Sequence, residues 1–69
     1  MLNIRLKELR KLNKVTQKQA AESTGIAERN YQRLEAGYNP NYETLLALAD
    51  YFNVSLDYLV GRSDIKERR

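Results

Sequence analysis

The chain has 69 residues and a net charge of +3, with 12 lysines and arginines against 9 aspartates and glutamates. It contains neither cysteine nor histidine, which excludes a disulfide framework and removes the commonest metal ligand and the commonest general base. No run approaches the roughly 20 apolar residues of a membrane span, and the amino terminus lacks the features of a signal peptide. We therefore expect one small, soluble, cytoplasmic domain that binds no metal, no cofactor and no membrane.

The charges are divided unevenly along the chain. Residues 1–33 hold eight basic residues against three glutamates, whereas residues 34–61 hold four acidic residues and no basic one. A chain with one basic half is expected to meet a polyanion with that half. An ordinary solvated surface explains the same asymmetry equally well, because charge distribution alone is a weak signal.

The first predicted helix covers residues 2–12. Its leucines recur at intervals of four, three and three residues, which is the spacing of one apolar helix face. That stripe consists of Leu2, Leu6, Leu9 and Leu12. Asn13 and Lys14 are expected to end the helix, because Asn tolerates the left-handed conformation found at helix ends.

The second predicted helix runs from about Gln17 to Ser23. Thr16 is placed to cap its first turn, and Gln19, three residues later, completes a capping box. Two adjacent alanines form an inward face that is small enough for a close helix crossing. Gly25 is expected to end the helix, because glycine adopts positive φ without a Cβ clash.

The third predicted helix runs from about Glu28 to Ala36. Its inward face carries Tyr31 and Leu34, and its opposite face is polar. That polar face consists of Glu28, Arg29, Gln32 and Arg33, with Asn30 at its edge. These side chains match base edges in the major groove, where Arg bonds guanine, Gln and Asn bond adenine, and Glu accepts from cytosine. A solvated face with pairs at i,i+4 is the alternative.

Two shorter signals complete the pattern of helices. Asn41 is placed to cap a fourth helix over residues 42–52, and Ser55 to cap a fifth over residues 56–60. Both segments carry apolar residues at helical spacing. Five short helices joined by short loops predict a compact all-α domain.

The last segment, residues 62–69, is polar and charged and is expected to form a flexible tail. The folded domain is therefore predicted to cover residues 1–61. No internal repeat, linker or low-complexity stretch interrupts it.

The start of the second helix is a predicted phosphate site. The first N–H groups of a helix have no partner in the helix and lie at the positive end of its dipole, so they attract anions. Gln17 and Lys18 stand at this end. The basic residues placed to flank it are Arg5, Lys7, Arg10 and Lys14. Phosphate contacts fix the register of a protein on DNA, and base contacts then specify the sequence.

Over about residues 2–61 the chain resembles the phage-repressor and Cro type of helix-turn-helix regulators, the XRE-like group. The ordered set of matching residues, with its spacings, is more specific than any one of its members. The set consists of Leu9-Arg10, Thr16-Gln17, Ala21, Gly25-Ile26, Leu34-Glu35, Gly37, Pro40, Leu45-Leu46, Ala49, Val54-Ser55 and Leu59.

The resemblance implies a sequence-specific regulator of transcription, expected to be a repressor, that reads the major groove of double-stranded DNA with the third helix. The positions that read bases in such regulators are occupied here by Glu28, Arg29, Gln32 and Arg33. Asn30 falls at a phosphate position. Gln17 is expected to bond a phosphate and to brace the start of the third helix. Arg10 and Glu35 match an ion pair between the first and third helices.

The resemblance also implies a homodimer on a palindromic operator, with half-sites about 34 Å apart. The candidate dimer surface lies away from the third helix and consists of Val54, Leu56, Tyr58 and Val60. Packing of these residues in the core is an equally weighted alternative. No small-molecule ligand is implied, and the chain is expected to be either a complete small repressor or the DNA-binding domain of a longer one.

Several residues depart from the pattern of such regulators or fit it poorly. Ala27 stands where Ser or Thr is usual, so the third helix lacks a side-chain cap, at a cost of about 1 kcal/mol. Tyr31 replaces an aliphatic residue and is hypothesised to fill volume left by smaller neighbours, namely Ala20 and Thr24. Glu28 is repelled by phosphates unless it reads a cytosine or holds one of the neighbouring arginines.

Two other classes of function remain for comparison. A helix-turn-helix domain that binds a protein partner, or an antitoxin, carries the same pattern. An enzyme finds no support, because the sequence offers no paired carboxylates at a plausible site and no glycine-rich phosphate loop.

Overall fold

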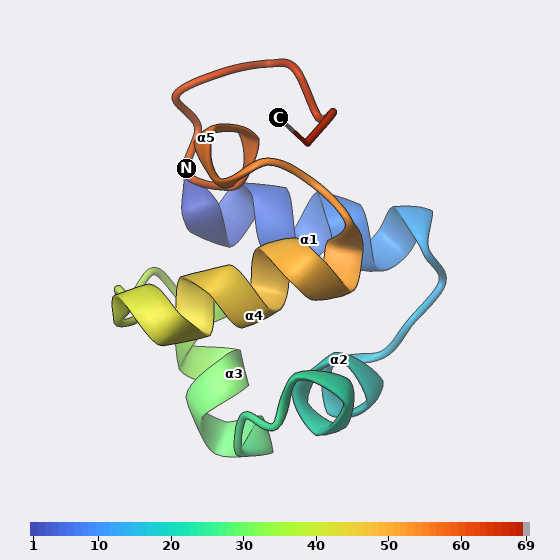
Figure 1. The fold of residues 1–69 in the computed structure, drawn as a ribbon. Helices are drawn as coiled ribbons and strands as arrows, with labels where there is room; N and C mark the ends of the chain where they lie inside the picture. Colours follow the sequence, from blue (N-terminus) through green and yellow to red (C-terminus); the bar gives the residue numbers. More distant parts are fainter. Residues whose placement is uncertain (69) are drawn as a thin grey trace.

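The computed structural model describes residues 1–68, which contain five α-helices and no strand. The helices are α1 (Leu2–Leu12), α2 (Gln17–Thr24), α3 (Glu28–Glu35), α4 (Tyr42–Phe52) and α5 (Leu56–Leu59). Helices α1 and α4 lie across the middle of the molecule, with α2 and α3 on one side and α5 on the other (Figure 1). The predicted all-α fold is confirmed, and the helix ends differ from the predicted ones by one residue at most. None of the described helices is long and apolar enough to cross a membrane.

The helix caps follow the local sequence. Thr16 Oγ1 accepts from the backbone N–H of Gln19 at 3.0 Å, and Gln19 Oε1 accepts from the N–H of Thr16 at 2.8 Å, so the predicted capping box is present. Gly25 ends α2 with φ of 75°. Asn41 Oδ1 accepts from the N–H of Thr44 at 2.8 Å at the start of α4. Ala27 offers no side-chain cap to α3, as the sequence predicts.

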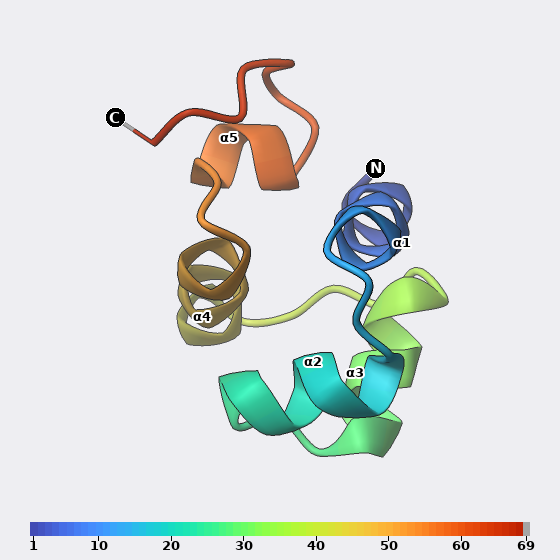
Figure 2. The same cartoon turned by 90° about the vertical axis from the view of Figure 1, so that its right-hand side faces the viewer.

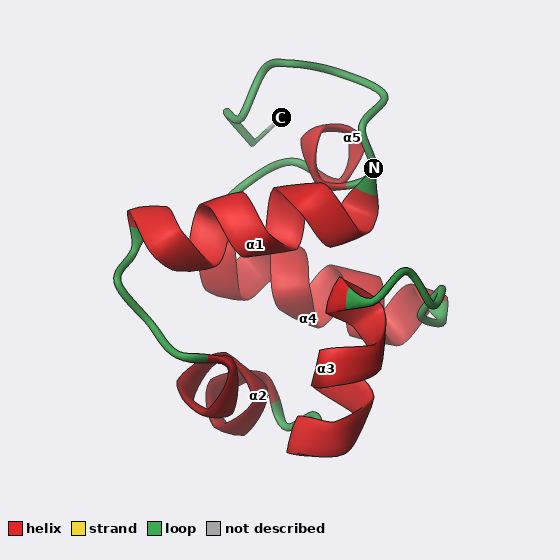
Figure 3. Ribbon diagram, turned by 180° about the vertical axis from the view of Figure 1, so that it is seen from behind, coloured by secondary structure: helices red, strands yellow, loops and turns green. Residues whose placement is uncertain are grey.

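The apolar stripe predicted on α1 is wrong in one member. Leu6 and Leu9 are buried, but the side chain of Leu12 is 64% exposed. The reason lies in the end of the helix, because the chain leaves α1 directly after Leu12 and turns away toward α2 (Figure 3). The left-handed residue of this turn is Lys14, with φ of 56°, whereas Asn13 keeps φ of −91°.

The core is built from one or a few side chains of every helix. Its largest fully buried members are Tyr31, Leu6, Leu48 and Leu59. Ala20 and Ala21 are buried too, and Thr24 turns its hydroxyl back onto the carbonyl of Ala20 at 2.8 Å. Tyr31 is fully buried, and its filling of the volume beside Ala20 and Thr24 stays a prediction.

The structure corrects the predicted dimer surface, because two of its four residues are buried. Val54 is 3% exposed and Tyr58 4% exposed, and both belong to the core. Tyr58 is covered by α1, because the guanidinium of Arg5 lies 4.0 Å from the centre of its ring. Leu56 and Val60 are half-buried. Val54 and Tyr58 therefore pack in the core, and the prediction that they form a dimer surface is wrong.

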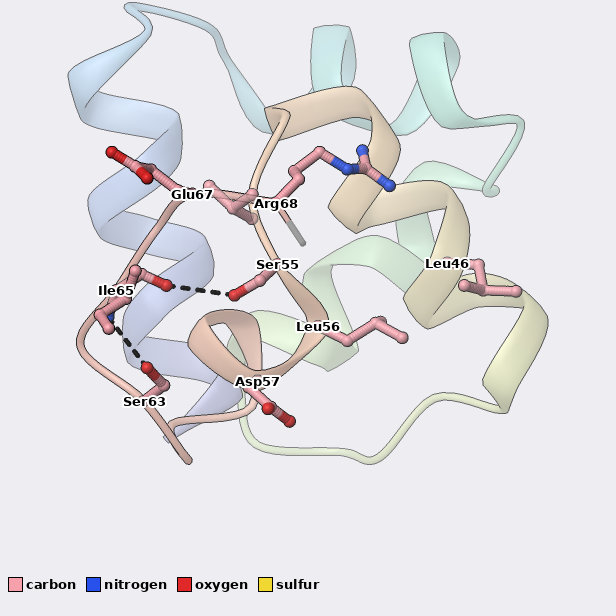
Figure 4. Close-up of a pocket in the computed structure, with 9 residues that line it drawn as sticks. Leu46, Ser55, Leu56, Asp57, Ser63, Ile65, Glu67 and Arg68 are labelled. Atoms are coloured by element: carbon pink, nitrogen blue, oxygen red, sulfur yellow. Dashed lines mark hydrogen bonds between the residues drawn. The ribbon is translucent and has the colours of Figure 1, made fainter.

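The segment after α5 turns back over α4 and α5. Ser55 donates its N–H to the carbonyl of Lys66 at 2.9 Å and its hydroxyl to that of Ile65 at 3.1 Å. Arg68 pairs with Asp50 of α4. Figure 4 shows the cleft that lies between this segment and the helices α4 and α5. Leu46 of α4 and Leu56 of α5 line this cleft. The flexible tail expected from the sequence stays a prediction.

Candidate nucleic-acid interface

Helices α2 and α3 form a compact unit around the turn at Gly25. The N–H of Ile26 donates to the carbonyl of Ala21 at 2.9 Å, which closes the end of α2 and starts the chain toward α3. Ala20 and Ala21 allow the two helices to approach closely, since neither carries more than a methyl group. The unit lies at the end of the molecule farthest from α5 and the tail (Figure 2).

The predicted reading face is assembled by α3 as the sequence spacing requires. Tyr31, Leu34 and Glu35 are buried, so the helix is held with its other face outward. The residues exposed on that face are Glu28, Arg29, Asn30, Gln32 and Arg33. An α-helix with its side chains is about 10–12 Å across, close to the roughly 12 Å width of the major groove of DNA. The five polar side chains therefore stand on an element of suitable size.

Glu28 is the unusual member of this face. Its Oε2 lies 3.5 Å from Nε2 of Gln32, one helical turn farther on. Within residues 1–68, neither Arg29 nor Arg33 forms an ion pair with it. Of the two roles considered for Glu28, the holding of an arginine is therefore absent from the structure, and the reading of a cytosine stays a prediction.

The first turn of α2 has backbone N–H groups that the helix itself does not use. The side chain of Thr16 accepts a hydrogen bond from the N–H of Gln19, and the carbonyl of Thr16 accepts one from the N–H of Ala20. The N–H groups of Gln17 and Lys18 make no hydrogen bond to any other part of residues 1–68. Two N–H groups at the positive end of the helix dipole are thus left for an anion. Lys18 and Lys14 are exposed nearby in the chain.

A buried carboxylate joins three helices behind this turn. Glu35 of α3 is 2% exposed, and its Oε2 lies 2.8 Å from Nε of Arg10 of α1. Its Oε1 accepts from the second guanidinium nitrogen of Arg10 at 3.1 Å and from Nε2 of Gln17 of α2 at 3.1 Å. The structure thus contains the ion pair that the resemblance implies, with a third partner that the sequence did not indicate.

Two predicted roles change because of this arrangement. Gln17 braces the end of α3, at Glu35, and the expectation that it braces the start is wrong. Arg10 directs two nitrogens to Glu35 and a third to the carbonyl of Val15 at 3.4 Å, and its side chain is only 20% exposed. Little of Arg10 remains for a phosphate. The physical reason is the position of Glu35 in the last turn of a helix, where the dipole disfavours a carboxylate and donors must compensate.

The protonation of the buried cluster follows from these contacts. Burial by itself raises the pKa of the Glu35 carboxyl, but hydrogen bonds from its neighbours, chiefly Arg10, outweigh it and hold that pKa below the ordinary value. Burial also raises the pKa of the Tyr31 hydroxyl, which faces the pair. That hydroxyl is buried and has no hydrogen bond of ordinary geometry to residues 1–68. Glu35 is therefore charged, and Tyr31 neutral, at neutral pH.

The structure places Arg5 away from the position that the sequence predicts for it. Arg5, expected beside the phosphate site, instead stacks on Tyr58 and bonds Asp64 at 2.9 Å. No sequence pattern signals a pair separated by 59 positions.

Beside α3, a polar cleft of about 370 Å³ runs along the loop to α4. Its polar lining includes Asn30, Arg33, Tyr38, Asn39, Asn41 and Thr44.

Comparison with known proteins agrees with this geometry. Residues 6–59 match the helix-turn-helix family. The chain is 41% identical over 68 residues to the HTH-type transcriptional regulator ImmR of Bacillus subtilis, an alignment that covers 97% of this chain and 54% of that protein. It is 39% identical over 59 residues to the cryptic phage CTXphi transcriptional repressor RstR of Vibrio cholerae, covering 84% of this chain and 53% of the repressor.

A solved structure supports the same assignment. The crystal structure of a transcriptional regulator from Listeria innocua superposes with a TM-score of 0.81 at 32% identity, covering 88% of this chain and 58% of that one. The chain therefore belongs to the helix-turn-helix family, in the XRE-type group that the sequence resembles. It spans about half the length of the curated relatives it matches.

Proposed function

We propose that this chain binds double-stranded DNA sequence-specifically and regulates transcription, as a repressor, by placing α3 in the major groove. The observation that carries the proposal is the combination of five exposed polar side chains on α3 with two N–H groups at the start of the adjacent helix that have no partner within residues 1–68. The first set suits base edges, and the second suits a phosphate. The relatives named as transcriptional regulators support the same reading.

The base contacts come from the exposed face of α3. Arg29 and Arg33 carry the fork of donors that bonds O6 and N7 of guanine together, and Gln32 has the donor and acceptor that match adenine. Neither arginine pairs with an acidic residue within residues 1–68, so neither must break an ion pair to meet a base. Glu28 accepts from cytosine N4 or weakens binding to other bases.

The phosphate contacts come from the first turn of α2 and from residues around it. Gln17 and Lys18 supply free backbone N–H groups and their own side chains, with Lys14 adjacent and Asn30 on the edge of α3. Arg10, expected among these contacts, adds little positive charge here because it is paired with Glu35. These contacts set the register in which α3 meets the bases.

A homodimer on a palindromic operator completes the proposed function, since one α3 reads only a few base pairs. Leu56 and Val60 are the members of the candidate surface that remain partly exposed, and they are proposed to contact a second copy on DNA. The proposed site of action is the cytoplasm of a prokaryote or of a phage-infected cell, where the DNA lies.

The salt dependence of binding to a duplex tests this function class. Neutralisation of several phosphates releases counterions, so affinity is expected to fall linearly with the logarithm of the salt concentration, with a steep slope. Weak binding that salt does not change would contradict the proposal. It would favour a protein-interaction module or an antitoxin that binds a protein partner.

A further inference from the structure

The side chain of Gln17 is held in the free protein by a buried carboxylate. Its Nε2 donates to Oε1 of Glu35 at 3.1 Å, between residues 18 positions apart. A side-chain amide has two N–H donors on this nitrogen, and Glu35 takes one of them. The second N–H has no partner within residues 1–68. Gln17 itself is half-buried, at the first position of α2.

We propose that Glu35 is a positioning residue for DNA binding, which fixes the amide of Gln17 so that its second N–H meets a phosphate. This inference rests on the proposed function, because it needs a DNA phosphate as the anion. Glu35 itself, 2% exposed, touches no DNA.

The carboxylate is a rigid support. Arg10 contacts both of its oxygens, at 2.8 and 3.1 Å, in a fork-to-fork arrangement. Since the pKa of Glu35 lies below its ordinary value, the carboxylate stays charged throughout the neutral range. A side chain already ordered before binding loses less conformational entropy when it bonds its ligand, so the contact is stronger than that of a mobile glutamine.

The same bond sets the register of the reading helix. Glu35 is the last residue of α3, and Arg10 belongs to α1, so a phosphate held by Gln17 is connected through one carboxylate to both helices. Glu28, at the opposite end of α3, has no bond to Gln17 and contacts Gln32 instead. The phosphate anchor is thus tied to the carboxyl end of the reading helix, and the base preference at Glu28 is independent of it.

The first test needs no substitution and no DNA. In the free protein the side-chain amide of Gln17 is expected to be ordered on the picosecond-to-nanosecond timescale, with an NMR order parameter near the value of about 0.85 for rigid backbone. The side-chain amides of Asn30 and Asn39, which are exposed and make no hydrogen bond within residues 1–68, serve as controls and are expected to be mobile. A Gln17 amide as mobile as these two would overturn the proposal.

The second test measures the coupling of Gln17 to the carboxylate. Replacement of both members of the buried pair by apolar residues of similar size, Arg10→Met with Glu35→Met, leaves no unpaired charge and is expected to keep the fold. In the wild-type background, Gln17→Ala should weaken binding to duplex DNA roughly tenfold, as expected for a hydrogen bond to a charged group. In the double-methionine background the same change should cost less than about threefold, whereas Lys18→Ala, the matched control, should cost the same in both.

The outcomes separate this inference from the function on which it rests. Wild-type protein that binds no duplex at low salt would overturn the proposed function. Wild-type protein that binds, with equal penalties for Gln17→Ala in the two backgrounds, would overturn only the positioning role of Glu35. If the double-methionine protein does not fold, the order parameter of Gln17 decides.

Discussion

The two ends of the molecule use their cations differently. At the end formed by α2 and α3, the side chains of Arg29 and Arg33 are exposed and make no ion pair within residues 1–68. At the end formed by α5 and the tail, Arg5 stacks on Tyr58 and bonds Asp64, and Arg68 pairs with Asp50. At the first end both of these arginines are left for a partner, whereas at the second end Arg5 and Arg68 are paired internally and Arg62 makes no ion pair within residues 1–68.

The difference explains why net charge alone says little about this protein. A charge of +3 is small, but an internal pair removes a cation from the surface field, so what matters is where the unpaired cations gather. Four of the cations without an ion pair within residues 1–68 lie on one face of α3 or near the start of α2, namely Arg29, Arg33, Lys14 and Lys18. The substitutions below test that division, in order of decreasing expected effect.

Tyr31→Ala tests whether the reading face depends on the core beneath it. Tyr31 is fully buried, and removal of a large aromatic side chain from a core costs about 3–5 kcal/mol of unfolding free energy. We expect a domain of this size to be largely unfolded by the change, as measured by chemical denaturation. An unchanged melting temperature with lost DNA affinity would instead make Tyr31 a DNA contact.

Arg10→Ala tests the pair that holds the three helices together. The change leaves the carboxylate of Glu35 buried without its main partner, which is expected to cost about 3 kcal/mol, at the lower end for buried pairs because Arg10 is partly exposed. Denaturant titration of the variant measures this loss. The double replacement Arg10→Met with Glu35→Met is the control, and it should recover most of the stability.

The same pair predicts a direction for the effect of acid. The pKa of Glu35 is lower in the folded protein than in the unfolded chain, so its stabilising contribution is complete above the unfolded pKa, about 4.3. It is lost as the pH falls through the folded pKa. Unfolding free energy measured between pH 7 and pH 3 should therefore decline below about pH 4.5, and this part of the decline should vanish in the double-methionine variant. Its persistence there would assign the acid sensitivity to other carboxylates.

Arg33→Ala and Lys18→Ala separate base contacts from phosphate contacts. Loss of the Arg33 fork should cost about 1–3 kcal/mol of binding free energy and relax the preference at one base pair. Loss of Lys18 should weaken all sequences alike and reduce the salt slope by about one. Arg68→Ala, at the other end of the molecule, is the matched control and should change neither quantity in duplex titrations.

Arg5→Ala is expected to have the smallest effect among these substitutions, and that effect is on the stability of the fold. Its cation–π contact with Tyr58, 4.0 Å from the ring centre, and its ion pair with the exposed Asp64 stabilise the fold only weakly, because surface contacts of this kind contribute little. We expect a small drop in melting temperature and unchanged DNA affinity. Reduced affinity with unchanged stability would place Arg5 at the DNA and break the division between the two ends.

The features that the sequence predicts well are local. The capping box of Thr16 and Gln19, the turn at Gly25 and the cap at Asn41 each depend on residues within four positions of one another, so a short window contains the whole cause. The outward face of α3 is predicted for the same reason, because helical periodicity alone separates Tyr31 from its polar neighbours.

The features that it does not predict depend on how distant segments meet. The bond between Gln17 and Glu35 requires the crossing of α2 and α3, and Arg5 meets Asp64 only when the tail returns to α1. Leu12 fits the apolar period of α1 and is still exposed, because the core ends one turn before the helix does. Periodicity gives the direction of a side chain, and it does not say whether a neighbour is present in that direction.

Selection of bound sites from a pool of random DNA duplexes tests the central claim most directly, with wild-type protein and Arg33→Ala compared side by side. Wild-type protein is expected to enrich a palindrome with half-sites about one helical turn apart, and Arg33→Ala to lose the preference at one base pair of each half-site while the rest of the motif persists. Absence of any enriched sequence from the wild-type selection, or the same motif with the same strength from both proteins, would contradict the claim that α3 reads DNA.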